Sequence, residues 1–273
     1  MPCRARFHTR GNIVLMVWVA ASPLAAAADC VGLPSSLHAA AITNSTTWSE
    51  SDASHELVRE SGTLSGSELS AGWRCNGWTV NAELAQVNGS RLYEGQSSAG
   101  LSAISHSAVR QRGLNLDAGL AISEAWRLGG RFSRNALWRD IASTQIASGY
   151  PEHFEWSIVS LGAEWRSALG PGELTLAAWA GGGVQSRLTL SLPGRDPARL
   201  SLGSLRQIEV VARWAAELAP PWTLAADVRY RRIDIDRGED AVISRSRQPV
   251  GVAHQPETRM TEQPLTIRIG YVF

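Results

Sequence analysis

Apolar and polar residues alternate along much of this sequence, in segments separated by glycine, proline and small polar residues. Successive side chains of a β-strand point to opposite faces, so this period of two predicts strands with one apolar and one polar face. Residues 264–273 show the pattern most clearly. One face of this segment is apolar and aromatic: Leu265, Ile267, Ile269, Tyr271, Phe273. Arg268 and small residues occupy the other face.

Tight-turn signals recur along the chain at a nearly constant interval, near residues 77, 124, 171 and 220. Asn76-Gly77 is the strongest of them, because both central residues of a type I′ hairpin turn adopt positive φ. A longer polar segment lies between each pair of tight turns, at 88–107, 139–154, 192–204 and 237–259. Units of strand, loop and strand therefore repeat, and the length that follows the N-terminal segment accommodates ten strands, an even number typical of barrels.

Charged residues keep to one face of the predicted strands. If the charge-free face contacts lipid, this segregation has a physical cause, because an arginine facing lipid at the bilayer midplane costs about 2–4 kcal/mol. The inward-facing set is then Arg74, Glu83, Asp117, Arg127, Arg131, Glu164, Arg166, Glu209, Arg213, Asp227, Arg229, Arg231, Arg268. One strand is ambiguous, because Trp179 has the opposite parity to Leu174 and Leu176, and the glycines at 181–183 indicate a bulge or a close backbone approach.

Residues 264–273 resemble the terminal strand of Gram-negative outer-membrane β-barrels, which alternates in this way and ends in an aromatic residue. The resemblance implies that Tyr271 and Phe273 form a signal for the outer-membrane assembly machinery. It also implies an all-β fold, a transmembrane antiparallel up-and-down β-barrel in the cell outer membrane, in contact with outer-membrane lipid and lipopolysaccharide. Such barrels have short periplasmic turns and long external loops, as the turn pattern requires. The alternative is a soluble β-domain that ends in an amphipathic strand.

The N-terminus has the pattern of a secretory signal peptide over residues 1–28. Arg4, Arg6 and Arg10 precede a short apolar run, and small residues precede Asp29. We expect the barrel over residues 54–273, with 29–53 either a periplasmic N-terminal segment or the first strand. The first strand is either 55–61 or an earlier segment around 36–43. In an oxidising compartment Cys30 and Cys75 either form a disulfide or remain free thiols.

Five tryptophans close to the tight turns predict an aromatic girdle at the membrane–water boundary. These are Trp73, Trp78, Trp126, Trp165 and Trp222. Trp138 and Trp156 flank the loop at 139–154 and predict the opposite girdle.

Composition excludes several classes of protein. The chain has 273 residues, a net charge of +1 and a mean hydropathy of −0.11, which gives no sign of a nucleic-acid partner. Beyond the N-terminus there is no apolar run near the ~20 residues of a spanning helix. The histidines are scattered and there is no nucleotide fingerprint, so we expect neither a metal site nor a cofactor.

A ten-stranded barrel has a narrow lumen. Arginines and carboxylates that meet there are expected to form an ion-pair network that plugs it. The loops would then carry function as a surface for recognition or adhesion with an unknown extracellular ligand. The loop candidates are Tyr93, Glu94, Gln96, Arg139, Asp140, Tyr150, Glu152, His153. The alternative is a narrow porin-like passage that weakly prefers anions, because arginines outnumber acids in the inward-facing set.

Size and strand count are also similar to the omptin proteases, ten-stranded barrels that cleave peptides at the outer rim with an Asp pair facing an Asp–His pair. Asp234, Asp236 and His153 lie near the expected rim, but the sequence has no Asp-x-His pair. Outer-membrane lipid A deacylases, which use a His/Ser pair, suggest His106-Ser107, but adjacent residues of a strand point apart. The sequence therefore favours a non-enzymatic role and keeps a rim hydrolase as the second alternative.

Overall fold

A computed structural model describes residues 33–53, 55–96 and 100–273. The predicted signal peptide and Cys30 lie outside the described residues. The strands that form the wall are β1 (Ser36–Asp52), β2 (His55–Cys75), β3 (Trp78–Gln96), β4 (Ser102–Ala121), β5 (Trp126–Ile141), β6 (Pro151–Leu169), β7 (Gly172–Leu190), β9 (Leu205–Ala219), β10 (Trp222–Ile235) and β13 (Glu257–Val272). No helix in these ranges is long and apolar enough to cross a membrane.

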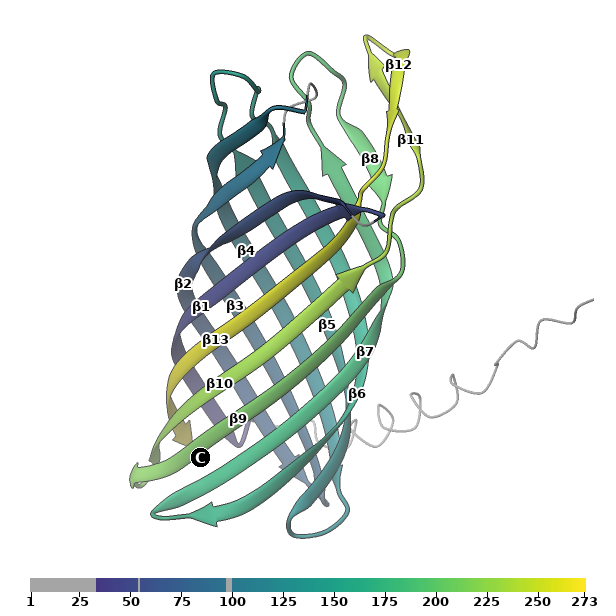
Figure 1. Ribbon diagram of the computed structural model, residues 1–273. Helices are drawn as coiled ribbons and strands as arrows, with labels where there is room; N and C mark the ends of the chain where they lie inside the picture. Colours follow the sequence, from purple (N-terminus) through teal and green to yellow (C-terminus); the bar gives the residue numbers. More distant parts are fainter. Residues whose placement is uncertain (1–32, 54, 97–99) are drawn as a thin grey trace, which may run out of the picture.

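The wall strands close on themselves (Figure 1). Each pairs antiparallel with its neighbours along the chain, β13 pairs with β1, and β6 pairs with β7, so that over the described residues ten strands form one barrel. This confirms the predicted fold class and strand number. Of the two candidates for the first strand, 36–43 belongs to β1, whereas 55–61 is the beginning of β2.

The two ends of the barrel differ as the turn pattern predicts. At the end we call the turn end, the strands are joined tightly, and Asn76 and Gly77 have φ of 45° and 81°. The Pro220–Pro221 turn at the same end contains a cis peptide bond. At the opposite end, the loop end, β8 (Ala198–Ser201) lies beside β7, and a hairpin of β11 (Ala241–Arg245) and β12 (Gln248–Ala253) rises above the rim (Figure 1).

The strands reach further toward the loop end than the sequence predicted. The predicted loop at 88–107 is mostly strand, because β3 runs to Gln96 and β4 begins at Ser102; the loop at 139–154 shrinks in the same way between β5 and β6. Wall strands of 14 to 21 residues exceed the ~9–11 residues that cross a bilayer. The wall therefore extends beyond the membrane, where outward polar residues are compatible with strand.

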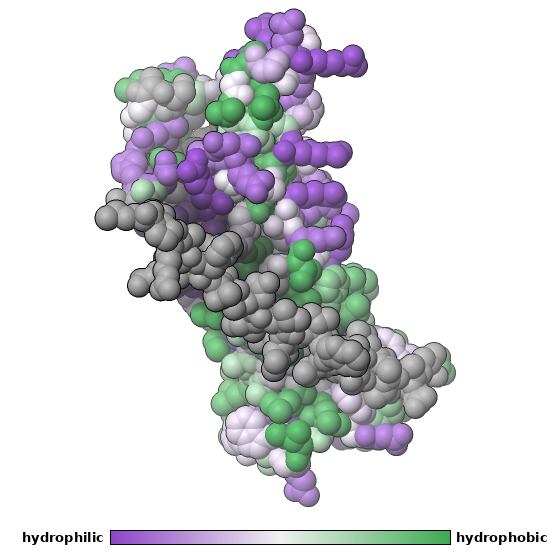
Figure 2. Space-filling view, turned by 90° about the vertical axis from the view of Figure 1, so that its right-hand side faces the viewer, coloured by the Kyte–Doolittle hydropathy of each residue, from purple (hydrophilic) through white to green (hydrophobic). Residues whose placement is uncertain are grey.

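The outer wall carries one apolar belt, near the turn end. Figure 2 shows hydrophobic side chains gathered over the lower part of the molecule and hydrophilic ones over the upper part. The belt contains outward residues of every strand, among them Leu69, Leu84, Leu114, Leu116, Phe132, Val159, Leu161, Ile208, Val210, Val228, Leu265, Ile267. Trp126 and Trp222 are exposed at its turn-end edge, as the predicted girdle requires.

The predicted opposite girdle is wrong. Trp156 faces the interior and is 3% exposed. Trp138 does face outward, but it stacks on His153 with ring centroids 4.6 Å apart, on the polar part of the wall. Both residues lie in the extended strands above the belt, where the position of a tryptophan does not mark a membrane boundary.

The ambiguous strand β7 has both features that its sequence indicated. Its register shifts opposite Ser157 and Ile158, which is a bulge. The close approach occurs at two glycines, one packed against backbone and one against a tryptophan ring. A Cβ at Gly181 would lie 2.4 Å from the carbonyl oxygen of Val159, and one at Gly162 would lie 2.4 Å from the Trp179 ring. Trp179 consequently points into the lumen, and glycines make room for it.

Candidate functional site

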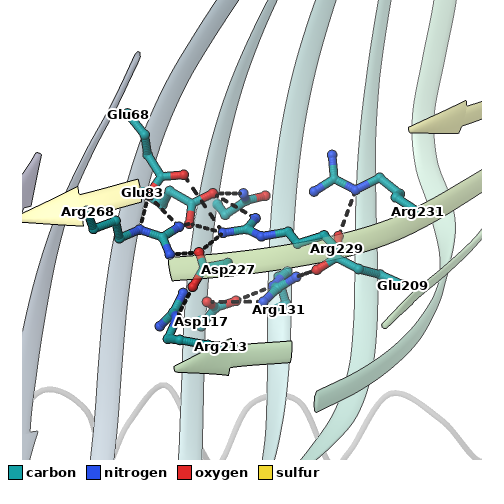
Figure 3. Close-up of polar contacts among 11 residues, drawn as sticks. Glu68, Glu83, Asp117, Arg131, Glu209, Arg213, Asp227, Arg229, Arg231 and Arg268 are labelled. Carbon is teal, nitrogen blue, oxygen red and sulfur yellow. Dashed lines mark hydrogen bonds and ion pairs between the residues drawn. The ribbon is translucent and has the colours of Figure 1, made fainter. Parts of the chain in front are cut away.

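Arginines and carboxylates of several strands meet inside the turn-end half of the barrel (Figure 3). We call this group the luminal lattice. Its members are Glu68, Glu83, Asp117, Arg131, Glu209, Arg213, Asp227, Arg229, Arg231, Glu262, Arg268. The lattice is built where it is because each of these residues has inward parity on its strand and lies at the height of the apolar belt, where an outward charge would meet lipid.

One part of the lattice joins strands on either side of the β1–β13 closure. Arg229 binds Glu83 with both terminal nitrogens, at 3.3 and 3.1 Å. Arg268 donates to Glu68 at 2.7 Å and also pairs with Asp227. Arg213 donates to the other oxygen of Asp227 at 2.6 Å. These bonds hold β2, β3, β10 and β13 together across the interior.

A second part crosses the lumen. Arg131 of β5 contacts Asp117 of neighbouring β4 and Glu209 of β9, both at 2.5 Å. Arg231 of β10 reaches the same Glu209 at 2.7 Å and Glu262 at 3.1 Å. The Arg131 guanidinium also lies over the Trp179 ring, 4.3 Å from its centroid. Because β5 and β9 are not neighbours in the wall, the bond between Arg131 and Glu209 spans the interior at this level.

The turn-end mouth of the lumen is open and polar. A cavity of about 340 Å³ lies there, lined by Arg74, Arg127, Glu164, Arg166 and others, and the lattice forms its floor. Arg127 pairs with Glu164, and Arg166 lies 3.6 Å from Glu164 and 3.9 Å from Glu173. The luminal lattice and these residues include every member of the predicted inward-facing set, although Arg74 is exposed at the mouth.

Above the lattice the lumen contains an apolar core. Its largest buried members are Trp48, Leu64, Leu137, Phe154, Ile158, Leu188, Leu200, Ile233 and Met260, each at most 2% exposed. The ring of Trp48 packs edge-on against Phe154 at 5.0 Å. These residues form one cluster of buried apolar side chains with further members from the same and other strands.

A second group of charges lies beside this core, and we call it the Arg139 cluster; the Arg139 guanidinium lies 4.9 Å from the centroid of the Trp48 ring. Arg139 donates to Glu152 at 2.6 Å and to Glu50 at 2.7 Å, and lies 3.5 Å from Glu60. Arg91 lies 3.7 Å from Glu60, and Ser107 donates to Glu60 at 2.6 Å. The cluster thus combines three carboxylates, Glu50, Glu60 and Glu152, with two arginines.

Because carboxylates outnumber arginines in the Arg139 cluster, the pKa of a carboxyl group there is raised. Glu152 lies outside the membrane-spanning part of β6, and burial together with the charge of Glu50 raises its pKa to about 7 against the pull of Arg139. Burial, with the carboxylate of Glu152, also raises the pKa of the loop residue Tyr150 well above its usual range. One carboxyl of the cluster therefore retains a proton near neutral pH.

The loop candidates do not form one surface. Tyr93, Arg139, Tyr150 and Glu152 are drawn together in and around the Arg139 cluster, inside the barrel. Glu94, Gln96, Asp140 and His153 have outward parity; Gln96 contacts His55 at 3.4 Å, and His153 stacks on Trp138. All except Tyr150 lie on strands rather than in loops, which corrects their predicted placement.

The residues considered for a hydrolase are not assembled. Asp234 faces outward on β10, bound to Arg232 and Arg259, and Asp236 binds Arg206. His153 lies on β6, separated from β10 by two intervening strands. His106 is exposed outside and Ser107 is buried inside, as adjacent strand residues should be. Within the described ranges, no group of three or more His, Cys, Asp or Glu side chains is arranged to hold a metal ion.

Two predictions concern the turn end. Cys75 is disulfide-bonded, but its predicted partner Cys30 lies outside the described residues. Tyr271 packs edge-on against Trp222 at 5.3 Å and against Phe273 at 4.9 Å. These aromatic contacts hold the chain terminus at the turn end (Figure 1), the position that the predicted assembly signal requires.

Comparisons with known proteins identify the fold. The barrel is similar to the outer membrane protease OmpT from Escherichia coli, with a TM-score of 0.53 and 11% identity over 88% of this chain and 97% of that one. It is more distantly similar to the translocator domain of the autotransporter NalP from Neisseria meningitidis, at a TM-score of 0.45 and 12% identity over 93% and 95% of the two chains. No family model and no curated protein matches the sequence. The chain therefore has the fold of outer-membrane β-barrel proteins, whose members differ in function.

Sequence reasoning missed a large part of what fills the lumen. The missed charges are Glu50, Glu60, Glu68, Arg91 and Glu262, and the apolar core was missed entirely. A detectable signal was present, because the inward parity of strands such as β2 continues without interruption past the belt. Extending the parity of Arg74 along β2, for example, reaches Glu68, Leu64 and Glu60.

Proposed function

We propose that this protein lies in the cell outer membrane as a closed barrel and serves in surface recognition or adhesion. The observation that supports this proposal is that three groups of side chains occupy the lumen: the luminal lattice, the apolar core and, beside this core, the Arg139 cluster. With the interior occupied, the surface left for a specific role is the loop end, which faces the outside of the cell in such barrels.

The most prominent feature of the loop end is the β11–β12 hairpin (Figure 1). Val242 and Val252 lie opposite each other in it and are 59% and 68% exposed. Val250 adds to this apolar surface. Exposed apolar surface bordered by polar residues is typical of interaction sites. The proposed ligand surface is therefore the hairpin and its valines.

The hairpin is held in place by contacts with the rim. Its turn residues Ser246 and Arg247 have positive φ, of 49° and 66°. The carboxylate of Asp196, in the connection between β7 and β8, accepts hydrogen bonds from both of their backbone N–H groups, at 3.2 and 2.7 Å. A positioned hairpin loses less conformational entropy on binding than a mobile loop, which favours recognition.

Two measurements test the proposal. In planar bilayers the purified protein should produce no single-channel conductance; stable anion-selective openings would establish the porin-like alternative instead. Bacteria that display the protein should adhere to cell monolayers, and Val242→Ser with Val252→Ser should lower adherence several-fold, because a buried valine contributes about 1.5–3 kcal/mol. The matched control, Ser61→Ala on the outer wall, should adhere as the wild type does. Equal adherence of the valine variant would contradict a role for the hairpin.

A further inference from the structure

The outer wall has a shallow groove at the upper edge of the apolar belt. It has a volume of about 400 Å³ and runs over β2 to β5. Leu69, Leu84 and Leu114 line its lower side, and Gln86, Arg112 and Arg134 line its upper side. One wall of the groove thus belongs to the lipid-facing surface and the other to the surface above it.

Arg112 and Arg134 are the first polar outward residues above the belt on their strands. Within the described part of the chain, no carboxylate lies within ion-pair distance of Arg112, whose Nε instead donates to the neutral Gln86 at 2.7 Å. Arg134 is 55% exposed and reaches Glu155 only at 3.5 Å, while Glu155 is engaged more closely by Arg187. The groove therefore carries positive charge that the protein does not neutralise.

The position of Arg112 is fixed in advance by an aromatic neighbour. Its guanidinium lies 5.6 Å from the Trp138 ring centroid, and that of Arg110 lies 5.2 Å from the same centroid. Trp138 is in turn stacked on His153. A stacked guanidinium keeps its donors free and oriented, which favours recognition of a planar or tetrahedral oxyanion.

The other side of the barrel provides a contrast. Arg206 of β9 and Arg232 of β10 are likewise the first polar outward residues above the belt. Each of them is bound by a carboxylate through two hydrogen bonds, Arg206 by Asp236 at 3.0 and 3.2 Å and Arg232 by Asp234 at 2.8 and 3.1 Å. Arginine at this height is therefore common to both walls, but on the β4–β5 wall Arg112 has a neutral partner and Arg134 reaches a carboxylate only at 3.5 Å.

We propose that the groove binds the phosphorylated headgroup of the outer-leaflet glycolipid, lipid A, with a phosphate between Arg112 and Arg134. The belt places the two arginines at the height where lipid headgroups begin, on the side of the membrane that carries this lipid. The acyl chains of the lipid lie along Leu69, Leu84 and Leu114, which continue directly into the belt. Phosphate accepts charge-assisted hydrogen bonds from guanidinium groups in the fork geometry that arginine presents.

The test compares two double variants of the full barrel in detergent micelles, titrated with bisphosphorylated lipid A at low salt. Arg112→Gln with Arg134→Gln should weaken binding at least about tenfold, because charge-assisted hydrogen bonds to phosphate are lost. Arg206→Gln with Arg232→Gln, the matched control, should change binding less than about twofold, because those arginines are already neutralised. Heat-modifiable migration on gels verifies that each variant is folded.

Two further arms identify the source of the phosphate. Wild-type protein should bind dephosphorylated lipid A about tenfold more weakly than the bisphosphorylated form, and inorganic phosphate alone should not compete. Arg112→Lys with Arg134→Lys keeps the charge but loses the guanidinium fork, so its affinity should lie between those of the wild type and the Gln variant. It also provides a readout if the Gln variant does not fold. Unchanged affinity in the Gln variant, an equal loss in the control, or competition by inorganic phosphate would each overturn the proposal.

Discussion

The two halves of β4 have the same parity but opposite chemistry. On β4, Leu114 and Leu116 face outward and Asp117 faces inward near the turn end. Further along the same strand, Arg112 faces outward and Val109 faces inward. What changes between the halves is the medium around the wall. With hydrocarbon around the lower half and water around the upper half, as in outer-membrane barrels, charged residues can face outward only in the upper half.

The comparison shows that strand alternation determines which face of the wall each residue lies on. It does not determine which of the two faces is apolar. Near the turn end, the outward residues are apolar and contact lipid. The inward residues are charged and pair with one another in the luminal lattice. Near the loop end the interior is apolar apart from the Arg139 cluster, and polar residues face outward. The boundary between the two regimes gives the height of the membrane on this protein.

The largest expected effect comes from breaking the luminal lattice. Arg229→Met removes the principal partner of Glu83 and leaves buried carboxylates unpaired, which should cost about 3–5 kcal/mol of unfolding free energy. Arg206→Met, which breaks an exposed pair on the outer wall, is the control and should cost less than about 1 kcal/mol. Urea unfolding in lipid vesicles measures both. Similar small losses would mean that the lower interior is hydrated and not a closed lattice.

Outward arginines sharpen the comparison at the membrane boundary. Leu116→Arg places a charge in the apolar belt and should cost about 2–4 kcal/mol, whereas Ala108→Arg, on the same face of β4 but nearer the loop end, should cost less than about 1 kcal/mol. At position 108 the cross-strand neighbour is Asp140, which offers the new arginine a partner. The same vesicle unfolding assay decides the result. An equal cost at both positions would place position 108 within the bilayer.

The smallest effect concerns the Arg139 cluster. The pKa of Glu152 is about 7 in the folded protein and 4.5 for an ordinary glutamate, so the folded state binds the proton more tightly. This group therefore lowers stability as pH rises from 4.5 to about 7, and no further above that. Glu152→Gln mimics the protonated form, so it should match the wild type below about pH 4 and be more stable by about 1–3 kcal/mol near pH 8. Loop-end stability that is equally pH-dependent in both proteins would contradict this assignment.

Much of the fold could be predicted because its signals are local. The alternation in residues 264–273, the turn at Asn76-Gly77 and the regular turn interval gave the strand number and the two distinct ends. Strand ends could not be predicted, because outward polar residues such as Asn88 and Ser90 are equally compatible with a loop and with a strand in water. Trp156 was assigned to a girdle for the same reason, since its environment depends on how far β6 extends.

The sequence by itself determined which residues share a face, because side-chain direction alternates along any strand, whatever surrounds it. Only the tertiary structure decided which charges meet, since Arg131 and Glu209 are brought together by closure of the ring and not by proximity in the chain. It also decided that Arg139 and Glu152 are buried rather than presented to a ligand. Burial depends on neighbouring strands and on the height of the membrane, and neither is encoded in the pattern of a single strand.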